Sequence, residues 1–359
     1  MTVFTAPAAA MSYLRDAAHS LGAADPTRVT EVRSAIQESL PLPVGDLAYR
    51  LKPPLASSYA EEKSGYLDFV LRPLGPLASP ADQSEAATQT MEDIVGHHYG
   101  AEALRWLKGY IEPVTGHRQG RSLRWGAQLG TSFDRNGVRE SMVTYEWSPD
   151  LMDAFPEALY RLARTAIDSV PGLRPAYSSI RCGRTSGSQQ VTFAIDAPLS
   201  LNALQPLMDR LGLGDKQAGL MSAIAFILGA RFTLPPNSSS ITLRPLRGGT
   251  ELRLDVNLEA IPDLPPQLMS LLRLQMAERP QSLRSMDAWL IAMTPEGYQS
   301  PGTLSILSVC VRPDMPARIT IHIRPPVLEQ PPSGAPPATV VTDSKALPAT
   351  TSAVFAYER

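Results

Sequence analysis

The sequence predicts an α+β fold in which helices surround a closed antiparallel β-barrel of about ten strands. Two observations support this prediction. A unit recurs five times, in which a short apolar strand ends near a proline and an amphipathic helix usually follows. Each unit is also predicted to hold a second strand, so five hairpins would supply ten strands whose neighbours pair antiparallel. The five proline-ended strands are expected at 66–73, 141–149, 190–198, 251–262 and 318–325.

The N-terminal part of the chain is expected to be helical. Within residues 1–40, a helix from about Met11 to Leu40 would cap or buttress the barrel. The first proline-ended strand, YLDFVLRP at 66–73, leads through a loop to a helix expected at about 88–111. Proline has no N–H and fixes φ, so it ends a strand at little cost and is tolerated in the first turn of a helix.

The middle of the chain shows a hairpin followed by a helix. Segment 122–133 precedes a DRNG turn that leads into 138–147, and a glycine-containing turn between two alternating runs is typical of a hairpin. After Pro149 the apolar residues recur on one face, which predicts a helix that lies on a sheet. These residues are Leu151, Phe155, Leu159, Leu162 and Ile167.

Two more hairpins are predicted in the C-terminal third. Segment 241–246 pairs through an RGG turn with 252–258, and 303–311 pairs through RPDMP with 319–323. Apolar and polar residues alternate in these strands, which gives each strand one apolar face toward helices and one polar face. Polar faces repeated on five units predict a shared lumen. The antiparallel units also argue against a TIM barrel, whose strands are parallel.

Composition sets further bounds on the 359-residue chain. We expect one barrel domain over 1–325 and a flexible tail over 326–359, because the tail is rich in Pro, Ala, Ser and Thr. The net charge is −2 with scattered basic residues, which does not suggest a nucleic-acid partner. No apolar run reaches about 18 residues, so no membrane span is expected. A cytoplasmic protein is expected, because no basic n-region of a signal peptide is seen. Its oligomeric state is left open.

The sequence contains no motif that identifies a particular reaction or cofactor. No His, Cys, Asp or Glu cluster has metal-ligand spacing, so neither a metal nor a cofactor is expected. No glycine-rich phosphate loop follows a strand, and no G-x-S-x-G nucleophile motif occurs. Cys182 and Cys310 lie in separate expected strands, and buried free thiols are the simpler expectation for them.

The candidate functional residues are therefore the polar residues that alternation assigns to the lumen. We expect them to form a ligand-binding wall, although some positions would face solvent at the rim if the alternation shifts. The aromatic residues of the same strands would line a pocket or pack against helices. The candidates are Thr144, Glu146, Gln190, Arg253, Asn257, Arg318 and His322, with Trp125 and Tyr145 as the aromatic members.

This five-fold α-β-β pattern resembles the aromatic prenyltransferases of the PT-barrel (ABBA) superfamily, and within it the tryptophan dimethylallyltransferase-like and bacterial indole prenyltransferase branch. The resemblance covers about residues 40–325 and rests on element order and on strand endings such as FVLRP, TYEWSP and ITIHIRP. It implies a metal-independent transferase of secondary metabolism with two small-molecule partners. An allylic diphosphate donor would be ionised in the lumen, and the prenyl group would pass to an indole-like or phenolic acceptor.

The chain departs from this family at the positions that hold the donor. Ala56 stands where the resemblance implies an acidic residue for the indole N–H. Thr144 and Glu146 stand where a lysine is implied, and Gln190 and Thr192 stand where cations are implied. Arg253 and Arg318 remain, but Asp255 follows the first, and His322 replaces an implied tyrosine after the second. Binding of a diphosphate needs several converging donors.

Two functions therefore stay open. The first is aromatic prenyl transfer with a divergent donor site, in which Arg253, Asn257, Arg318, Gln190, Thr144, Trp125 and Tyr145 bind substrates. The second is a barrel that has lost diphosphate binding and acts on a hydrophobic or aromatic small molecule as a cyclase or isomerase. Glu146 and His322 would then serve as acid or base.

Overall fold

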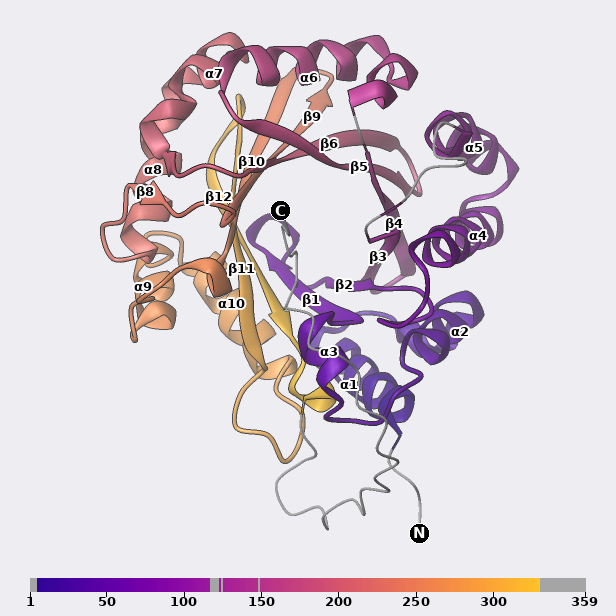
Figure 1. The fold of residues 1–359 in the computed structure, drawn as a ribbon. Coiled ribbons are helices and arrows are strands. Elements are labelled where there is room, and N and C mark those ends of the chain that lie inside the picture. The colour runs from indigo at the N-terminus through magenta and orange to yellow at the C-terminus, as the bar shows by residue number, and fades with distance from the viewer. Residues whose placement is uncertain (1–4, 117–122, 124, 148, 330–359) are drawn as a thin grey trace.

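The computed structural model describes residues 5–116, 123, 125–147 and 149–329 and shows a closed ten-stranded barrel (Figure 1). All ten strands pair antiparallel, which confirms the predicted α+β barrel. Around the barrel the strand order is β1-β12-β11-β10-β9-β6-β5-β4-β3-β2. The strands are β1 (Leu55–Ala60), β2 (Leu67–Leu71), β3 (Ala127–Asp134), β4 (Gly137–Glu146), β5 (Leu173–Gly183), β6 (Gly187–Ile195), β9 (Ser239–Leu246), β10 (Gly249–Asn257), β11 (Thr303–Arg312) and β12 (Met315–Arg324).

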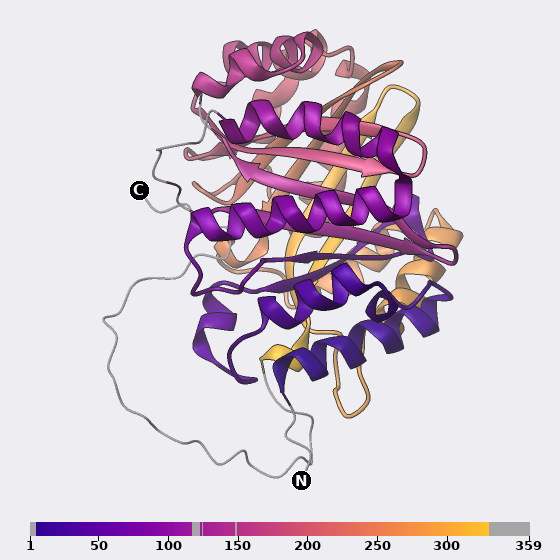
Figure 2. The ribbon, with the colours of Figure 1, turned by 90° about the vertical axis from the view of Figure 1, so that its right-hand side faces the viewer.

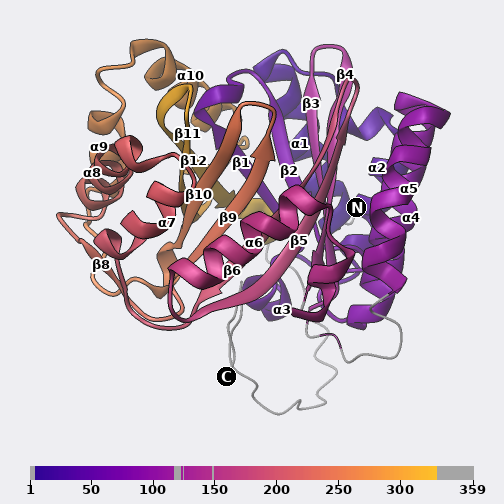
Figure 3. The ribbon, with the colours of Figure 1, turned by 90° about the horizontal axis from the view of Figure 1, so that it is seen from above.

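Helices surround the barrel on its outside, as Figures 1 and 3 show. A further pair of short strands, β7 (Leu199–Ser200) and β8 (Thr233–Leu234), forms a separate two-stranded sheet. The helices are α1 (Ala6–Leu21), α2 (Thr30–Ser39), α3 (Leu47–Leu51), α4 (Pro80–Tyr99), α5 (Ala101–Gly116), α6 (Glu157–Ser169), α7 (Gln205–Arg210), α8 (Gln217–Ile227), α9 (Leu268–Gln275) and α10 (Pro280–Ala292).

Two long helices predicted from the sequence are each interrupted at a glycine. The predicted helix at 88–111 is two helices, α4 and α5, because Gly100 ends α4 with φ +88, a left-handed value that favours glycine. The predicted N-terminal helix is likewise α1 and α2, and Gly22 ends α1 with φ +68. Figure 2 shows α4 and α5 running side by side across the outside of the barrel. Ser79 caps α4 by accepting a bond from the Asp82 N–H.

The hydrophobic core lies between the barrel and the helices. Alternate residues of each strand point outward and are fully buried there, including Leu254, Val256, Ile319 and Ile321. Helix α6 buries Leu159, whereas Leu151 and Phe155 are buried in the segment that precedes it. The predicted division of each strand into an apolar helix-facing side and a polar lumen side is therefore correct.

The first residues of the predicted tail pack against the barrel domain. Residues Pro326–Leu328 form a short 3-10 helix, and Val327 and Leu328 are buried against the core. The remaining tail residues, 330–359, lie outside the described residues. Both cysteines are buried and free, as expected. Within the described part of the chain, no helix is long and apolar enough to cross a membrane.

Ion pairs cluster at the end of the barrel where the hairpins turn. Glu61, whose side chain is 0% exposed, contacts Arg279 and Arg318, and it also accepts the Ile319 N–H at 3.1 Å. Similar groups form around two other carboxylates: Glu140 with Lys63 and Arg181, and Glu251 with Arg244 and Arg312. A buried charge needs such partners because desolvation is costly. These groups hold the hairpin end of the barrel together.

Replacing Glu61 with Gln should therefore lower the free energy of unfolding by about 2–4 kcal/mol, since two arginines would lose their buried counter-charge. Chemical denaturation followed by circular dichroism measures this loss. The matched control is Glu157→Gln, because Glu157 pairs with Arg161 and both side chains are more than 70% exposed. That change should cost less than about 0.5 kcal/mol. Equal losses in the two variants would contradict the structural role of Glu61.

Candidate functional site

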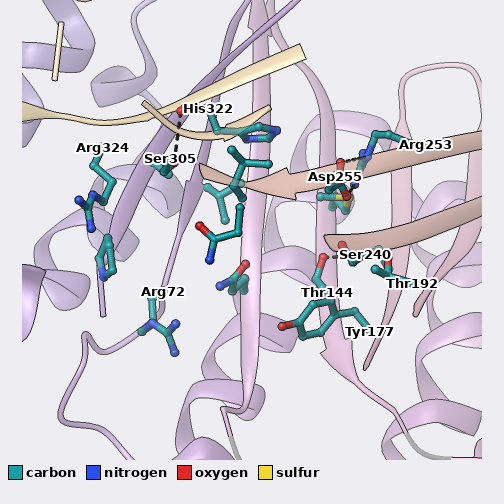
Figure 4. A pocket seen from close by; sticks show the side chains of 18 of the residues that line it. Arg72, Thr144, Tyr177, Thr192, Ser240, Arg253, Asp255, Ser305, His322 and Arg324 are labelled. Carbon is teal, nitrogen blue, oxygen red and sulfur yellow. Dashed lines mark hydrogen bonds and ion pairs between the residues drawn. The ribbon is translucent and has the colours of Figure 1, made fainter. Parts of the chain in front are cut away.

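A cavity of about 160 Å³ lies inside the barrel, at the end away from the hairpin turns. Its lining comes from the C-terminal parts of β2, β4, β6, β10 and β12 and from the N-terminal parts of their partner strands (Figure 4). An apolar cavity of about 150 Å³ accommodates benzene, so this space admits a ring-sized group. Most of its polar lining is uncharged: Gln128, Thr144, Ser179, Gln190, Thr192, Ser238, Ser239, Ser240, Asn257 and Ser305.

Five of the residues predicted from alternation line this cavity. They come from four strands, because even-numbered steps along each strand keep the same face. Thr144 bonds Ser179 across β4 and β5 at 2.9 Å, and Arg253 and Asn257 follow each other on β10. The five are Thr144, Gln190, Arg253, Asn257 and His322. Their part in binding or catalysis stays a prediction.

Two predicted site residues do not line this cavity: Arg318 faces the lumen as predicted, whereas the prediction that Tyr145 lines a pocket is wrong. Arg318 has the expected strand face but sits nearer the hairpin end, where Glu61 holds it at 3.0 Å. Tyr145 has the opposite face: its ring is fully buried and its hydroxyl is 2.6 Å from Thr88 Oγ1 on α4. Tyr145 is therefore part of the core between sheet and helix.

Glu146 and Trp125 lie beside the cavity rather than in its lining. Glu146 accepts the backbone N–H of Trp125 at 3.2 Å. The Trp125 ring meets Tyr177 edge-on, with centroids 4.5 Å apart, and Tyr177 does line the cavity. Glu146 thus orders the chain next to the cavity, and nothing places its carboxylate among the lining groups.

Arg72 is a lining residue that the sequence analysis did not select. It follows β2 directly, donates its backbone N–H to Pro54 O at 2.8 Å, and is 8% exposed. Its Nε is buried without a hydrogen-bond partner, and among the described residues no carboxylate lies within ion-pair distance. Burial lowers the pKa of Arg72, although nearby Tyr177 raises it. The signal was present, because Arg72 is two residues beyond lumen-facing Val70.

The other two arginines of the cavity are neutralised by carboxylates. Arg253 donates to both oxygens of Asp255, at 2.8 and 3.1 Å. Burial alone would lower the pKa of Arg253, but the charge of Asp255 raises it. Arg324 pairs with Glu259 at 2.5 Å and with Glu329 at 3.5 Å. Arg72 is therefore the one cavity arginine, within the described chain, whose charge is not compensated.

His322 faces the cavity as a neutral imidazole. Burial lowers the pKa of His322 to about 4. The Asp255 charge raises this pKa and the Arg253 charge lowers it, so the two together do not offset the effect of burial. At neutral pH such a ring is uncharged, so it lacks the acidic proton of an imidazolium and is a weak base. It offers one hydrogen-bond donor and one acceptor instead. The described residues contain no group of three His, Cys, Asp or Glu that would hold a metal ion.

Comparison with known proteins relates this geometry to one fold. No protein-family model and no curated protein matches the chain. Among solved structures, the prenyltransferase PriB covers 91% of this chain at 14% identity and TM-score 0.65, and 98% of PriB is covered. The 5-dimethylallyl tryptophan synthase of Streptomyces coelicolor, in complex with DMASPP and Trp, covers 95% of this chain and is itself 99% covered, at 15% identity and TM-score 0.67.

A third similar structure is the 6-dimethylallyltryptophan synthase of Micromonospora olivasterospora, also in complex with DMASPP and Trp. It covers 91% of this chain and is itself 99% covered, at 13% identity and TM-score 0.69. Likeness at this level of identity shows the fold. The chain has the PT-barrel fold of tryptophan prenyltransferases, as the resemblance in its sequence implied.

The depressed pKa of His322 predicts a pH dependence of stability. The unfolded chain binds a proton at this residue below about pH 6.5, whereas the folded chain does so only near pH 4. Proton binding therefore stabilises the unfolded state relative to the folded state as pH falls from about 6.5 to about 4. Between pH 7 and 5 wild-type protein should lose about 1–2 kcal/mol more stability than His322→Gln, measured by urea unfolding at each pH. Identical pH dependence in both proteins would contradict a neutral, buried imidazole.

Proposed function

We propose that this barrel is an aromatic prenyltransferase, which transfers a prenyl group from an allylic diphosphate to an indole-like or phenolic acceptor. The observation that carries the proposal is Arg72, a buried arginine without an ion-pair partner among the described residues, in the lining of a cavity inside this fold. A charge of this kind is costly to bury unless an anion completes it.

Arg72 would bind the diphosphate of the donor. Its guanidinium supplies charge-assisted hydrogen bonds that strengthen as the C–O bond to the prenyl carbon breaks and negative charge collects on the diphosphate. The amide of Gln190 and the hydroxyl of Thr144 are neutral donors in the same lining. The prenyl carbon then bonds to the acceptor ring, and the ring carbon loses a proton to a base or to water.

The ring of Tyr177 also belongs to the proposed mechanism. It lines the cavity beside Arg72, and Trp125 holds it edge-on at 4.5 Å. An aromatic face attracts a cation, so Tyr177 would stabilise the allylic cation while keeping water away. His322, neutral at pH 7, would accept or donate a hydrogen bond rather than act as the acid.

One observation favours the second candidate, a barrel that acts on a small aromatic molecule without a diphosphate. Asp255 neutralises Arg253, and two glutamates neutralise Arg324. Among the described lining residues, Arg72 is then the one uncompensated cation to face an anion of several charges. Asp255 would also repel a diphosphate nearby. Prenyl transfer then requires Arg72 to supply most of the positive charge that binds the donor diphosphate.

We expect Arg72→Gln to weaken binding of dimethylallyl thiolodiphosphate about tenfold to a hundredfold, since one buried charge-assisted contact is worth about 1.5–3 kcal/mol. Isothermal titration calorimetry measures the affinity. The control is Arg174→Gln, because Arg174 pairs with Asp196 on the surface and does not line the cavity. If wild-type protein binds no allylic diphosphate at millimolar concentration, prenyl transfer is excluded and the second candidate remains.

The ion pair on β10 supplies a second expectation about the donor. Replacing Arg253 with Gln and Asp255 with Asn together removes two opposite charges that cancel, so the affinity for dimethylallyl thiolodiphosphate should change less than about threefold. Calorimetry on this double variant beside Arg72→Gln compares the two sites directly. A loss as large as that of Arg72→Gln would show that Arg253, as the resemblance implied, carries donor binding.

A further inference from the structure

The cavity wall formed by β9, β10 and β12 carries charged residues but no net free charge. Arg253 and Asp255 satisfy each other, and His322 is neutral (Figure 4). Arg324, at the edge of this wall, is held by Glu259 and Glu329. A substrate ammonium or carboxylate placed here would have to break one of these pairs or stay unpaired, and either is costly away from water.

Three neutral groups on the same wall retain hydrogen-bonding capacity. Within the described chain, the ring nitrogens of His322, the hydroxyl of Ser240 and the side-chain N–H of Asn257 bond no other residue; the Asn257 side-chain oxygen already accepts from the Glu259 N–H. Ser240 pairs in register with Asp255, and Asn257 and His322 both pair with Ile306. The three groups therefore lie on one continuous part of the wall.

The chemistry of these groups matches an amide. A neutral imidazole has one donor and one acceptor, a hydroxyl has both, and the Asn257 side chain adds an N–H donor. A carboxamide likewise presents one acceptor oxygen and an N–H donor. An uncharged group of this kind would satisfy the wall without an unpaired charge, whereas a free α-amino acid would bring both an ammonium and a carboxylate.

We propose that the acceptor presents an uncharged amide to Ser240, Asn257 and His322, so that the substrate class is a neutral amide derivative of an aromatic amino acid rather than the free amino acid. This inference rests on the proposed function for the aromatic acceptor. It differs from the structural neighbours, whose complexes contain tryptophan. Arg72, which follows β2 and also lines the cavity, would bind the anionic donor.

Four indoles in which the amino and carboxyl groups are free or blocked test the proposal: tryptophan, tryptophanamide, N-acetyltryptophan and N-acetyltryptophanamide. Each is titrated by calorimetry with and without saturating dimethylallyl thiolodiphosphate. We expect the neutral N-acetyltryptophanamide to bind at least tenfold more tightly than tryptophan or tryptophanamide in both titrations. Tryptophan binding as tightly as the neutral amide, or no binding of any of the four at millimolar concentration, overturns the inference. Failure of the thiolodiphosphate alone to bind bears on the proposed function only.

Two variants show where the discrimination arises. Asn257→Ala should weaken binding of N-acetyltryptophanamide about threefold to tenfold while leaving the thiolodiphosphate affinity unchanged, and loss of the cap on the Glu259 N–H should lower the melting temperature slightly without unfolding the protein. Asp255→Asn should free Arg253 and so raise the affinity for anionic N-acetyltryptophan at least tenfold, with the thiolodiphosphate present to occupy Arg72. If Asp255→Asn folds, as judged by circular dichroism, and shows no such gain, charge compensation does not set the specificity. If it does not fold, the result for Asn257→Ala decides.

Discussion

The closure of the barrel with a two-residue side-chain period is the constraint on which the rest of the structure depends. Each strand must send every second side chain inward, and the inside of a barrel of this size is too wide for those side chains to fill. Apolar residues such as Leu254 and Ile321 therefore pack outward against helices, and the molecule places its main core outside the barrel. The lumen is left to polar groups, which must satisfy one another or a ligand.

Most charged side chains in this lumen form ion pairs with one another rather than await a ligand. At the hairpin end, Glu61, Glu140 and Glu251 each hold two basic residues. The same solution extends into the cavity, where Asp255 holds Arg253. Each pairing removes a cation that would otherwise recruit an anion. The chemistry open to the cavity thus follows from which charges remain, and Arg72 stands out for that reason.

Sequence periodicity was enough to predict the barrel, the helix layer and the lumen face of His322, because these depend on local alternation. It failed where a distant partner decides the outcome. Arg318 has the correct face, but it lies early on β12 near the hairpin turn, where Glu61, from a distant part of the chain, pairs with it. Tyr145 was misplaced because an aromatic residue suits either face, and Thr88 on α4 provides its hydroxyl partner. The sequence shows that Arg253 and Asp255 are two residues apart on one strand. That Arg253 donates to both oxygens of Asp255 is known only from the structure.

The seam of the barrel has a consequence for how the chain acquires its structure. Strand β1 pairs with β12, so Ser57 lies opposite Ile323, and the barrel closes only after its last strand has been synthesised. Pairings between such distant segments are slow to form, because a large loop must be ordered before any contact rewards it. During synthesis the earlier hairpins therefore expose an unpaired edge at β1. Protection of that edge until β12 is made becomes a requirement of biosynthesis rather than of the finished protein.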